Sequence, residues 1–165
     1  MILLTVGTQL PFDRFVQIVD RYAPKMPERI FAQIGRGRYV PKNMDCVPFI
    51  GPIEFEEKVR TCSLIVSHAG IGTIVMAQKH GKPMVLFPRL ARLDEHRNDH
   101  QLATVAALGE RQGIQTAMNE DELVARLAGP HPAPTPGTDL PERNRLRDAV
   151  SILVREALGE GASGP

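Results

Sequence analysis

The sequence Leu64-Ile65-Val66-Ser67-His68-Ala69-Gly70-Ile71-Gly72-Thr73 holds the clearest structural signal in this chain. Its apolar start is rich in β-branched residues, which is typical of a buried strand. Two glycines, Gly70 and Gly72, follow the strand and allow a sharp turn and the close approach of a ligand. Helix-compatible residues then run from Ile74 to His80, so the first free N–H groups of a helix should lie beyond the end of the strand. Such a helix start favours an anion.

The composition indicates one cytoplasmic domain. The 165 residues suffice for one domain with a sizeable core but not for two nucleotide-binding domains. The net charge of +1 gives no sign of a nucleic-acid partner. Cys46 and Cys62 lack metal-ligand spacing and lie in or beside apolar segments, which favours reduced, buried thiols. No apolar run approaches the roughly 20 residues of a spanning helix, and the apolar start is better interpreted as a strand than as a signal peptide.

Strand-like runs alternate with helix-period segments over residues 1–128, which predicts an α/β fold with a Rossmann-like, mainly parallel sheet and helices on both faces. The first helix is the clearest, because Phe12, Phe15, Val16, Val19 and Tyr22 share one face and a proline follows. The predicted strands are Ile2–Val6, Ile30–Ile34, Cys46–Phe49, Leu64–Ser67, Met84–Phe87 and Ile114–Thr116. The further predicted helices are Glu54–Thr61, Thr73–His80, Asn98–Leu108 and Glu120–Leu127.

The remainder of the chain is predicted to be a linker, a helix and a tail. Residues 129–141 contain five prolines and two glycines, which predicts an exposed linker. Residues 142–158 have an amphipathic pattern, with one apolar stripe made of Leu146, Val150, Leu153, Val154 and Leu158. This helix either folds back on its own domain or docks on a partner chain. Residues 159–165 are predicted to be disordered.

The loops that follow the strands should meet at the carboxyl edge of the sheet, where open α/β sheets bind ligands. In the loop after the first strand, Gly7 permits a tight turn. Thr8 either offers its hydroxyl to a phosphate or an acceptor, or caps the following helix. Asp13 is interpreted as a first-turn residue that serves the helix dipole, with catalysis as the alternative. Arg36 and Arg38 are interpreted as surface charge rather than as phosphate ligands.

The pattern Ser-His-Ala-Gly-x-Gly-Thr at residues 67–73 resembles the donor-binding half of family 28 glycosyltransferases, which have the two-domain GT-B architecture. The resemblance runs from Ile2 to Leu127. It is strongest for the single-domain branch, in which the small subunit of a split enzyme supplies the nucleotide-sugar site. The eukaryotic enzyme that adds the second N-acetylglucosamine to a dolichol-linked sugar belongs to this branch. Residues 95–101, Glu-His-Arg-Asn-Asp-His-Gln, are most similar to bacterial exopolysaccharide glucuronosyltransferase subunits.

The resemblance implies a nucleotide site built from three of the loops. In the loop Phe49-Ile50-Gly51, main-chain groups at Ile50 would recognise uracil, although an ordinary strand end before a turn would look the same in sequence. Residues around the diphosphate would be Gly7, Thr8, His68, Gly70, Gly72 and Thr73. The helix start would stabilise the charge that grows on the leaving nucleotide. The alternative for His68 is a hydrogen bond to a neighbouring loop.

A fourth loop is implied to bind the donor sugar. His100 and Gln101 match a pair with which relatives hold the donor hydroxyls, and Glu95, His96 and Asp99 are candidates for the same pocket. The alternative is a solvated charged loop in which Asn98 or Asp99 caps the next helix. A uronic acid donor would be favoured if a sugar carboxylate paired with one of the arginines Arg89, Arg92 and Arg97.

One position departs from the wider GT-B pattern. Many of these enzymes place a glutamate eight residues after the position of His68, where it accepts both ribose hydroxyls, and this chain has Met76 there. A thioether cannot accept those hydrogen bonds in the same way. Ribose recognition is therefore expected to be weaker or to come from elsewhere.

Together these features predict the donor-binding subunit of a split inverting glycosyltransferase. It would transfer a hexosyl group from a UDP-sugar to a lipid-linked acceptor in exopolysaccharide or related glycan synthesis, without a cofactor or metal. The general base and the acceptor site would come from a membrane-associated partner subunit, which would hold this chain at the membrane. A non-catalytic nucleotide-binding or assembly subunit is the alternative. An NAD-dependent oxidoreductase is disfavoured, because neither glycine-rich turn has a complete Gly-x-Gly-x-x-Gly.

Overall fold

A computed structural model of the chain describes residues 1–98, 100–108 and 111–133. Its strands are β1 (Ile2–Thr5), β2 (Ile30–Gln33), β3 (Asp45–Val47), β4 (Leu64–Ser67), β5 (Met84–Leu86) and β6 (Ile114–Thr116). Its α-helices are α1 (Asp13–Tyr22), α2 (Pro52–Thr61), α3 (Ile71–Lys79), α4 (His100–Leu108) and α5 (Glu120–Ala128). Two short 3₁₀ helices, η1 (Ala23–Lys25) and η2 (Ala91–Leu93), complete the described elements.

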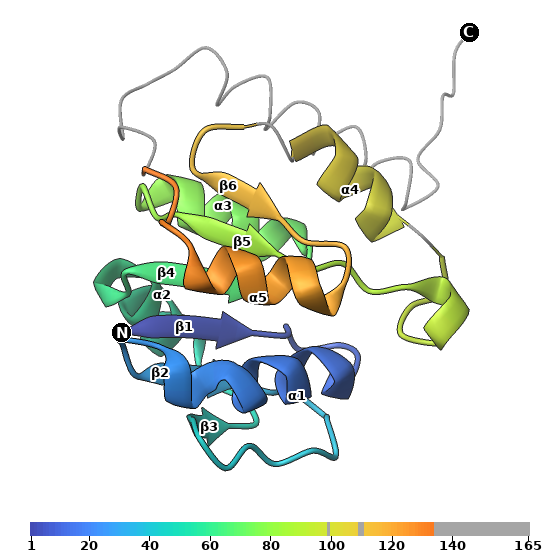
Figure 1. The fold of residues 1–165 in the computed structure, drawn as a ribbon, viewed down its shortest axis with the longest axis horizontal. Coiled ribbons are helices and arrows are strands. Elements are labelled where there is room, and N and C mark those ends of the chain that lie inside the picture. The colour runs from blue at the N-terminus through green and yellow to red at the C-terminus, as the bar shows by residue number, and fades with distance from the viewer. Residues whose placement is uncertain (99, 109–110, 134–165) are drawn as a thin grey trace, which may run out of the picture.

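The strands form one sheet in the order β3-β2-β1-β4-β5-β6 (Figure 1). Every neighbouring pair is parallel. This order is that of a doubly wound Rossmann fold, and it reverses between β1 and β4, the point at which such sheets bind ligands. The predicted Rossmann-like α/β class is therefore confirmed.

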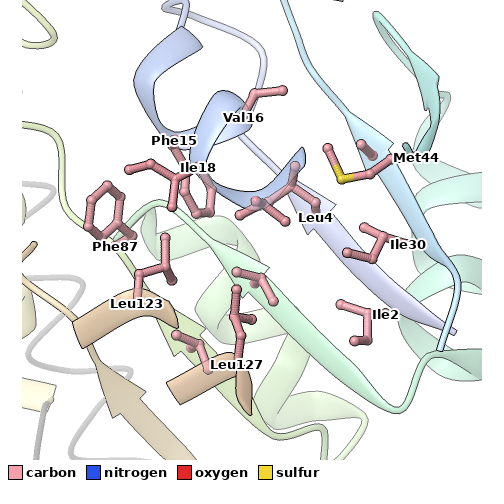
Figure 2. Packing of buried hydrophobic residues seen from close by; sticks show 14 of the residues in the cluster. Ile2, Leu4, Phe15, Val16, Ile18, Ile30, Met44, Phe87, Leu123 and Leu127 are labelled. Atoms are coloured by element: carbon pink, nitrogen blue, oxygen red, sulfur yellow. The ribbon is translucent and has the colours of Figure 1, made fainter. Parts of the chain in front are cut away.

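Helices cover both faces of the sheet (Figure 1), and an apolar layer lies on each face. On one face α1 and α5 pack against inward residues of the strands, and Figure 2 shows Phe15 and Ile18 of α1 near Leu123 of α5 and Phe87. On the other face α2, α3 and α4 cover the alternate strand residues. Strands buried on both faces are apolar nearly throughout, which explains why these segments were evident in the sequence.

The connection between β2 and β3 has no helix and is fastened instead to α1. The buried carboxylate of Asp20 accepts hydrogen bonds from the main-chain N–H groups of Lys42 and Asn43, at 3.1 and 2.8 Å, and from the hydroxyl of Tyr39 at 2.7 Å. Asp13 accepts the N–H groups of Tyr39 and of the residue before it. Asp13 therefore lies in the first turn of α1, as predicted, and its carboxylate holds a connection.

Several element ends differ from those predicted. The strand β3 ends before Pro48, which cannot donate to a ladder, so the predicted Cys46–Phe49 is displaced. The helix α2 begins at Pro52, a favourable residue for a first helical position. The helix α3 begins at Ile71 rather than at Thr73, because Gly70 is extended and serves as its N-cap residue. The first turn of α3 therefore includes the second glycine of the motif.

The predicted helix over residues 142–158 and the predicted tail over 159–165 lie outside the described residues. Of the predicted linker, residues 129–133 follow α5 without helix or strand. Within the described part of the chain, no helix is long and apolar enough to span a bilayer. Cys62 is buried, Cys46 is half-buried and both are free thiols.

Candidate functional site

The loops after β1, β3, β4 and β5 all leave the carboxyl edge of the sheet, as predicted. The loops after β1 and β4 lie at the reversal of strand order and touch each other through His68. A Cβ added to Gly7 would lie 2.8 Å from Cε1 of that imidazole, and one added to Gly70 would overlap its Nε2. Gly7 also has φ of +75°, a conformation that favours glycine. The imidazole therefore fills the space that two glycines leave.

His68 is neutral near pH 7. Burial, and then the nearby charge of Arg89, lower the pKa of His68 from 6.5 to about 4. The hydroxyl of Ser67 donates to the main-chain oxygen of His68 at 2.9 Å. A neutral imidazole carries no positive charge and has one N–H donor, for which the main chain of Thr5 competes with any phosphate. Both predicted roles, a phosphate contact and a loop contact, stay compatible with this position.

The start of α3 presents free donors. The N-cap residue Gly70 has no capping side chain, and the N–H groups of Ile71, Gly72 and Thr73 have no acceptor among the described residues. A Cβ added to Gly72 would meet nothing within 4 Å, and Gly72 has no positive φ. Neither the backbone conformation nor a neighbour therefore requires glycine there. The open space beside these amides suits an anion.

Thr8 is exposed on the loop after β1. The helix α1 begins at Asp13 with Phe12 as its N-cap residue and no side-chain cap, so the interpretation of Thr8 as a helix cap is wrong. The hydroxyl of Thr8 has no hydrogen-bond partner among the described residues. Its predicted contact with a phosphate or an acceptor stays a prediction.

The loop after β3 exposes main-chain groups. Phe49 is 48% exposed, and the N–H and C=O groups of Phe49 and Ile50 make no hydrogen bond within the described residues. The buried carboxamide of Gln33 fixes the start of this loop, because its Nε2 donates to the oxygens of Pro48 and Gly7, both at 3.0 Å. Gln33 thus joins two site loops. Its only sequence signal was a polar residue at the end of an apolar strand.

The carboxylate of Glu95 forms hydrogen bonds within the protein. Its carboxylate accepts two hydrogen bonds from Arg14, at 2.6 and 2.8 Å, and one from the N–H of Leu90 at 2.9 Å. These contacts fasten the loop after β5 to α1. The guanidinium of Arg14 also lies 4.5 Å from the ring centre of Phe87. Glu95 was predicted to lie in the sugar pocket, and the structure shows its carboxylate occupied by these three donors.

The other residues of this loop lie at or before the start of α4. His96 is close enough to His68 to contribute to its lowered pKa. His100 is exposed, and its N–H donates to Oδ1 of Asn98 at 3.3 Å. The carboxamide oxygen of Gln101 accepts the N–H of Arg89 at 3.0 Å. Asp99 lies outside the described residues.

The arginines have separate locations. Arg89 is buried and points toward the loop after β1, where it binds main-chain oxygens. A pairing of Arg89 with a sugar carboxylate, one of the alternatives raised from the sequence, is therefore disfavoured. The exposed arginines of the predicted set are Arg92, Arg97, Arg36 and Arg38. Met76, at the position of the ribose-binding glutamate in many GT-B enzymes, lies half-buried on α3.

Comparisons with known proteins bear on the family and the fold. The model of the glycosyltransferase family 28 C-terminal domain matches residues 1–129. The UDP-N-acetylglucosamine--N-acetylmuramyl-(pentapeptide) pyrophosphoryl-undecaprenol N-acetylglucosamine transferase of Rhodospirillum centenum is 28% identical over 99% of this chain and 48% of its own length. The chain thus spans about half the length of that curated relative.

Several solved structures share the fold, including those of ALG13 and of Acinetobacter baumannii MurG. The NMR solution structure of ALG13 has a TM-score of 0.60 at 19% identity, with 88% of this chain and 93% of that chain covered. The crystal structure of Acinetobacter baumannii MurG has a TM-score of 0.55 at 21% identity, with 74% of this chain and 39% of that chain covered. The sheet is therefore one half of a GT-B architecture, as predicted. From the match over residues 1–129, the chain belongs to the glycosyltransferase family 28 C-terminal domain family.

Proposed function

We propose that this chain is the donor-binding subunit of a split inverting glycosyltransferase that uses a UDP-sugar. The observation that carries the proposal is the open start of α3 in a family 28 donor half. There the N–H groups of Ile71, Gly72 and Thr73 are free of partners among the described residues, beside a glycine that nothing in the described chain requires. A diphosphate fits amide donors and the positive end of a helix dipole.

The proposed reaction is a single displacement. An acceptor hydroxyl attacks the anomeric carbon from the face opposite the diphosphate, a new C–O bond forms, and the bond to the phosphate oxygen breaks. UDP leaves with the electron pair, and the hydroxyl proton passes to a general base. The amides at the start of α3 stabilise the charge that develops on the leaving phosphate, so the proposal does not call on a metal ion.

The uridine would lie between the loops after β3 and β4. The free main-chain groups of Phe49 and Ile50 offer one donor and one acceptor each, which suits the edge of a pyrimidine. The sugar would extend toward the start of α4, where His100 is exposed and Gln101 has donors to spare. In this arrangement Thr8 and Gly7 approach the diphosphate from the loop after β1.

The acceptor site and the general base are assigned to a partner. The chain covers 48% of its curated relative, and the described residues form one Rossmann-like sheet. A GT-B cleft lies between two such halves. We propose that a membrane-associated subunit supplies the second half and the lipid-linked acceptor, and that it holds this chain at the cytoplasmic face of the membrane. The product would be an exopolysaccharide or a related glycan.

One observation favours a second candidate function. Met76 stands where many GT-B enzymes carry the carboxylate that binds ribose, and no carboxylate of the described residues forms a hydrogen bond with the first turn of α3. A subunit that binds nucleotide weakly and mainly activates its partner would tolerate this residue. The two candidates differ in what the donor-sugar residues do during transfer.

Calorimetric titration tests the main proposal. The purified chain is titrated with UDP, UDP-glucose, UDP-glucuronate and UDP-N-acetylglucosamine, and with NAD as the control. Binding of uridine nucleotides without binding of NAD is the expected result, whereas no uridine nucleotide binding would refute a donor site. In the assembled complex, replacing His100 and Gln101 by alanine should abolish transfer. Persistent transfer would favour the assembly subunit.

A further inference from the structure

Arg89, just after β5, is a buried cation that is bound almost entirely to main-chain oxygens. It is 2% exposed, and its Nη2 donates to the oxygens of Val6 and Leu10, both at 2.8 Å. Its Nη1 donates to the oxygen of Pro11, and its guanidinium carbon lies 4.5 Å from the ring centre of Phe12. Burial lowers the pKa of Arg89 to about 10, so the side chain is charged near pH 7. All three oxygens belong to the loop after β1.

These contacts determine which groups the loop presents outward. Gln33 Nε2 binds the oxygen of Gly7 at 3.0 Å, so four carbonyl groups of the loop are bound from within the protein. The N–H groups of residues 8–10 have no acceptor among the described residues. A loop whose carbonyl groups are held inward and whose amides are free presents donors, which is the arrangement of an anion-binding nest.

Arg89 also reaches the start of α4 through its own main chain. Its N–H donates to Oε1 of Gln101 at 3.0 Å, in a buried contact. Because the carboxamide oxygen of Gln101 is used in this way, its NH₂ group is left as a donor. A single residue therefore orients the amides of the loop after β1 and the carboxamide at the start of α4.

An arginine suits this position better than any other side chain. Its planar guanidinium holds several N–H donors in a fixed fork, whereas a lysine ammonium is a compact charge on a flexible stem. The stacking on Phe12 fixes the plane of that fork. Without the guanidinium, three carbonyl groups of the loop would lose their donors and the loop would be free to turn them outward.

We propose that Arg89 is a positioning residue for the donor diphosphate. It does not touch the nucleotide but holds the loop after β1 so that the N–H groups of residues 8–10 face the diphosphate at the start of α3. This inference rests on the proposed function, because it requires a diphosphate at that edge of the sheet. Its charge, which already lowers the pKa of His68, adds to the positive potential there.

The test compares UDP with uridine, which lacks the diphosphate. Dissociation constants are measured by calorimetry for UDP and by NMR titration for uridine, with the full chain, R89M and R89K. R60M is the matched control, because Arg60 is an exposed arginine near the end of α2, away from the carboxyl edge. R89M should weaken UDP binding about 10- to 100-fold, the range for lost charge-assisted hydrogen bonds, and leave uridine binding unchanged.

R89K should lie between the wild-type chain and R89M, because it retains the charge and some of the donors. R60M should bind both ligands as the wild type does. A purely structural role would lower the melting temperature of R89K while the ratio of the UDP and uridine constants stayed the same, and that result would overturn the inference.

A measurement on the unmodified chain covers the case in which the variants do not fold. Addition of UDP should shift the amide proton resonances of Thr8, Gln9 and Leu10 downfield, as new hydrogen bonds to phosphate do, whereas uridine should not. UDP binding without these shifts would overturn the role of Arg89 and leave the proposed function intact. If the wild-type chain binds no uridine nucleotide, the proposed function itself fails.

Discussion

Replacing Gly72 by alanine should stabilise the protein and at the same time weaken nucleotide binding. The residue lies in the first turn of α3, has no positive φ, and a Cβ there would meet nothing within 4 Å. The fold therefore has room for a methyl group. Alanine reduces the entropy of the unfolded chain and has the higher helix propensity, so the free energy of unfolding should rise by about 0.5–1 kcal/mol.

The same methyl group would occupy the space proposed for a phosphate oxygen. Displacing the diphosphate from the amides of Gly72 and Thr73 should weaken UDP binding at least about tenfold, or about 1.4 kcal/mol. Urea unfolding measures the first effect and calorimetry with UDP the second. V75A is the matched control, because Val75 is exposed on the same helix and its replacement should leave UDP binding unchanged.

Two outcomes would refute this reasoning. Unchanged UDP affinity in G72A would show that the diphosphate does not approach the start of α3. Lower stability would show that the fold requires the glycine after all. G70A provides the contrast, because its Cβ would overlap the imidazole of His68, and both stability and binding should fall.

Three further results are expected. Burial raises the pKa of Asp20, but its hydrogen bonds from Tyr39 and from main-chain N–H groups outweigh this and hold the pKa below the ordinary 3.8. The stabilisation from this carboxylate should be complete above that pH and be lost as the pH falls further, so urea unfolding between about pH 5 and about pH 3 should show a smaller pH dependence for D20N than for the wild type. The imidazole ¹⁵N shifts of His68 should indicate a neutral ring from pH 5.5 to pH 8, and a titration near pH 6.5 would contradict its pKa of about 4. Burial raises the pKa of Cys62 to about 11, so at pH 8 a thiol reagent should modify it about 100-fold more slowly than in the urea-unfolded chain, and equal rates would contradict its burial.

The sequence was sufficient for the strands and for the motif loops, because both depend on local patterns. Strands buried on both faces are short apolar runs, and a glycine pair after such a run identifies a turn. The start of α3 was placed two residues late because glycine has low helix propensity, although the first turn tolerates it. The predicted end of β3 is too late, because apolar residues continue past Pro48 in the sequence. Pro48 itself has no N–H group to donate to the ladder.

The partners of the charged residues could not be predicted in this way. Glu95 and Arg14 lie far apart in sequence, and only the return of the chain to the carboxyl edge brings them together. The contacts of Arg89 could not be predicted either, because its partners are main-chain carbonyl groups, which every residue type has. The polar run of residues 89–101 is interpreted from the sequence as ligand-binding. In the structure, Arg89 and Glu95 of this run attach the loop after β5 to the loop after β1 and to α1.

The helix-free connection between β2 and β3 has a mechanical consequence. Its two fastenings, Asp13 and Asp20, both belong to α1, and the edge strand β3 contributes only three residues to the sheet. This edge of the molecule, which precedes the loop proposed to bind the base, is therefore held both by α1 and by the parallel pairing of β3 with β2. A motion that lifts this helix would remove the side-chain fastenings of the connection, so α1 and the connection should exchange their amide protons as one cooperative unit.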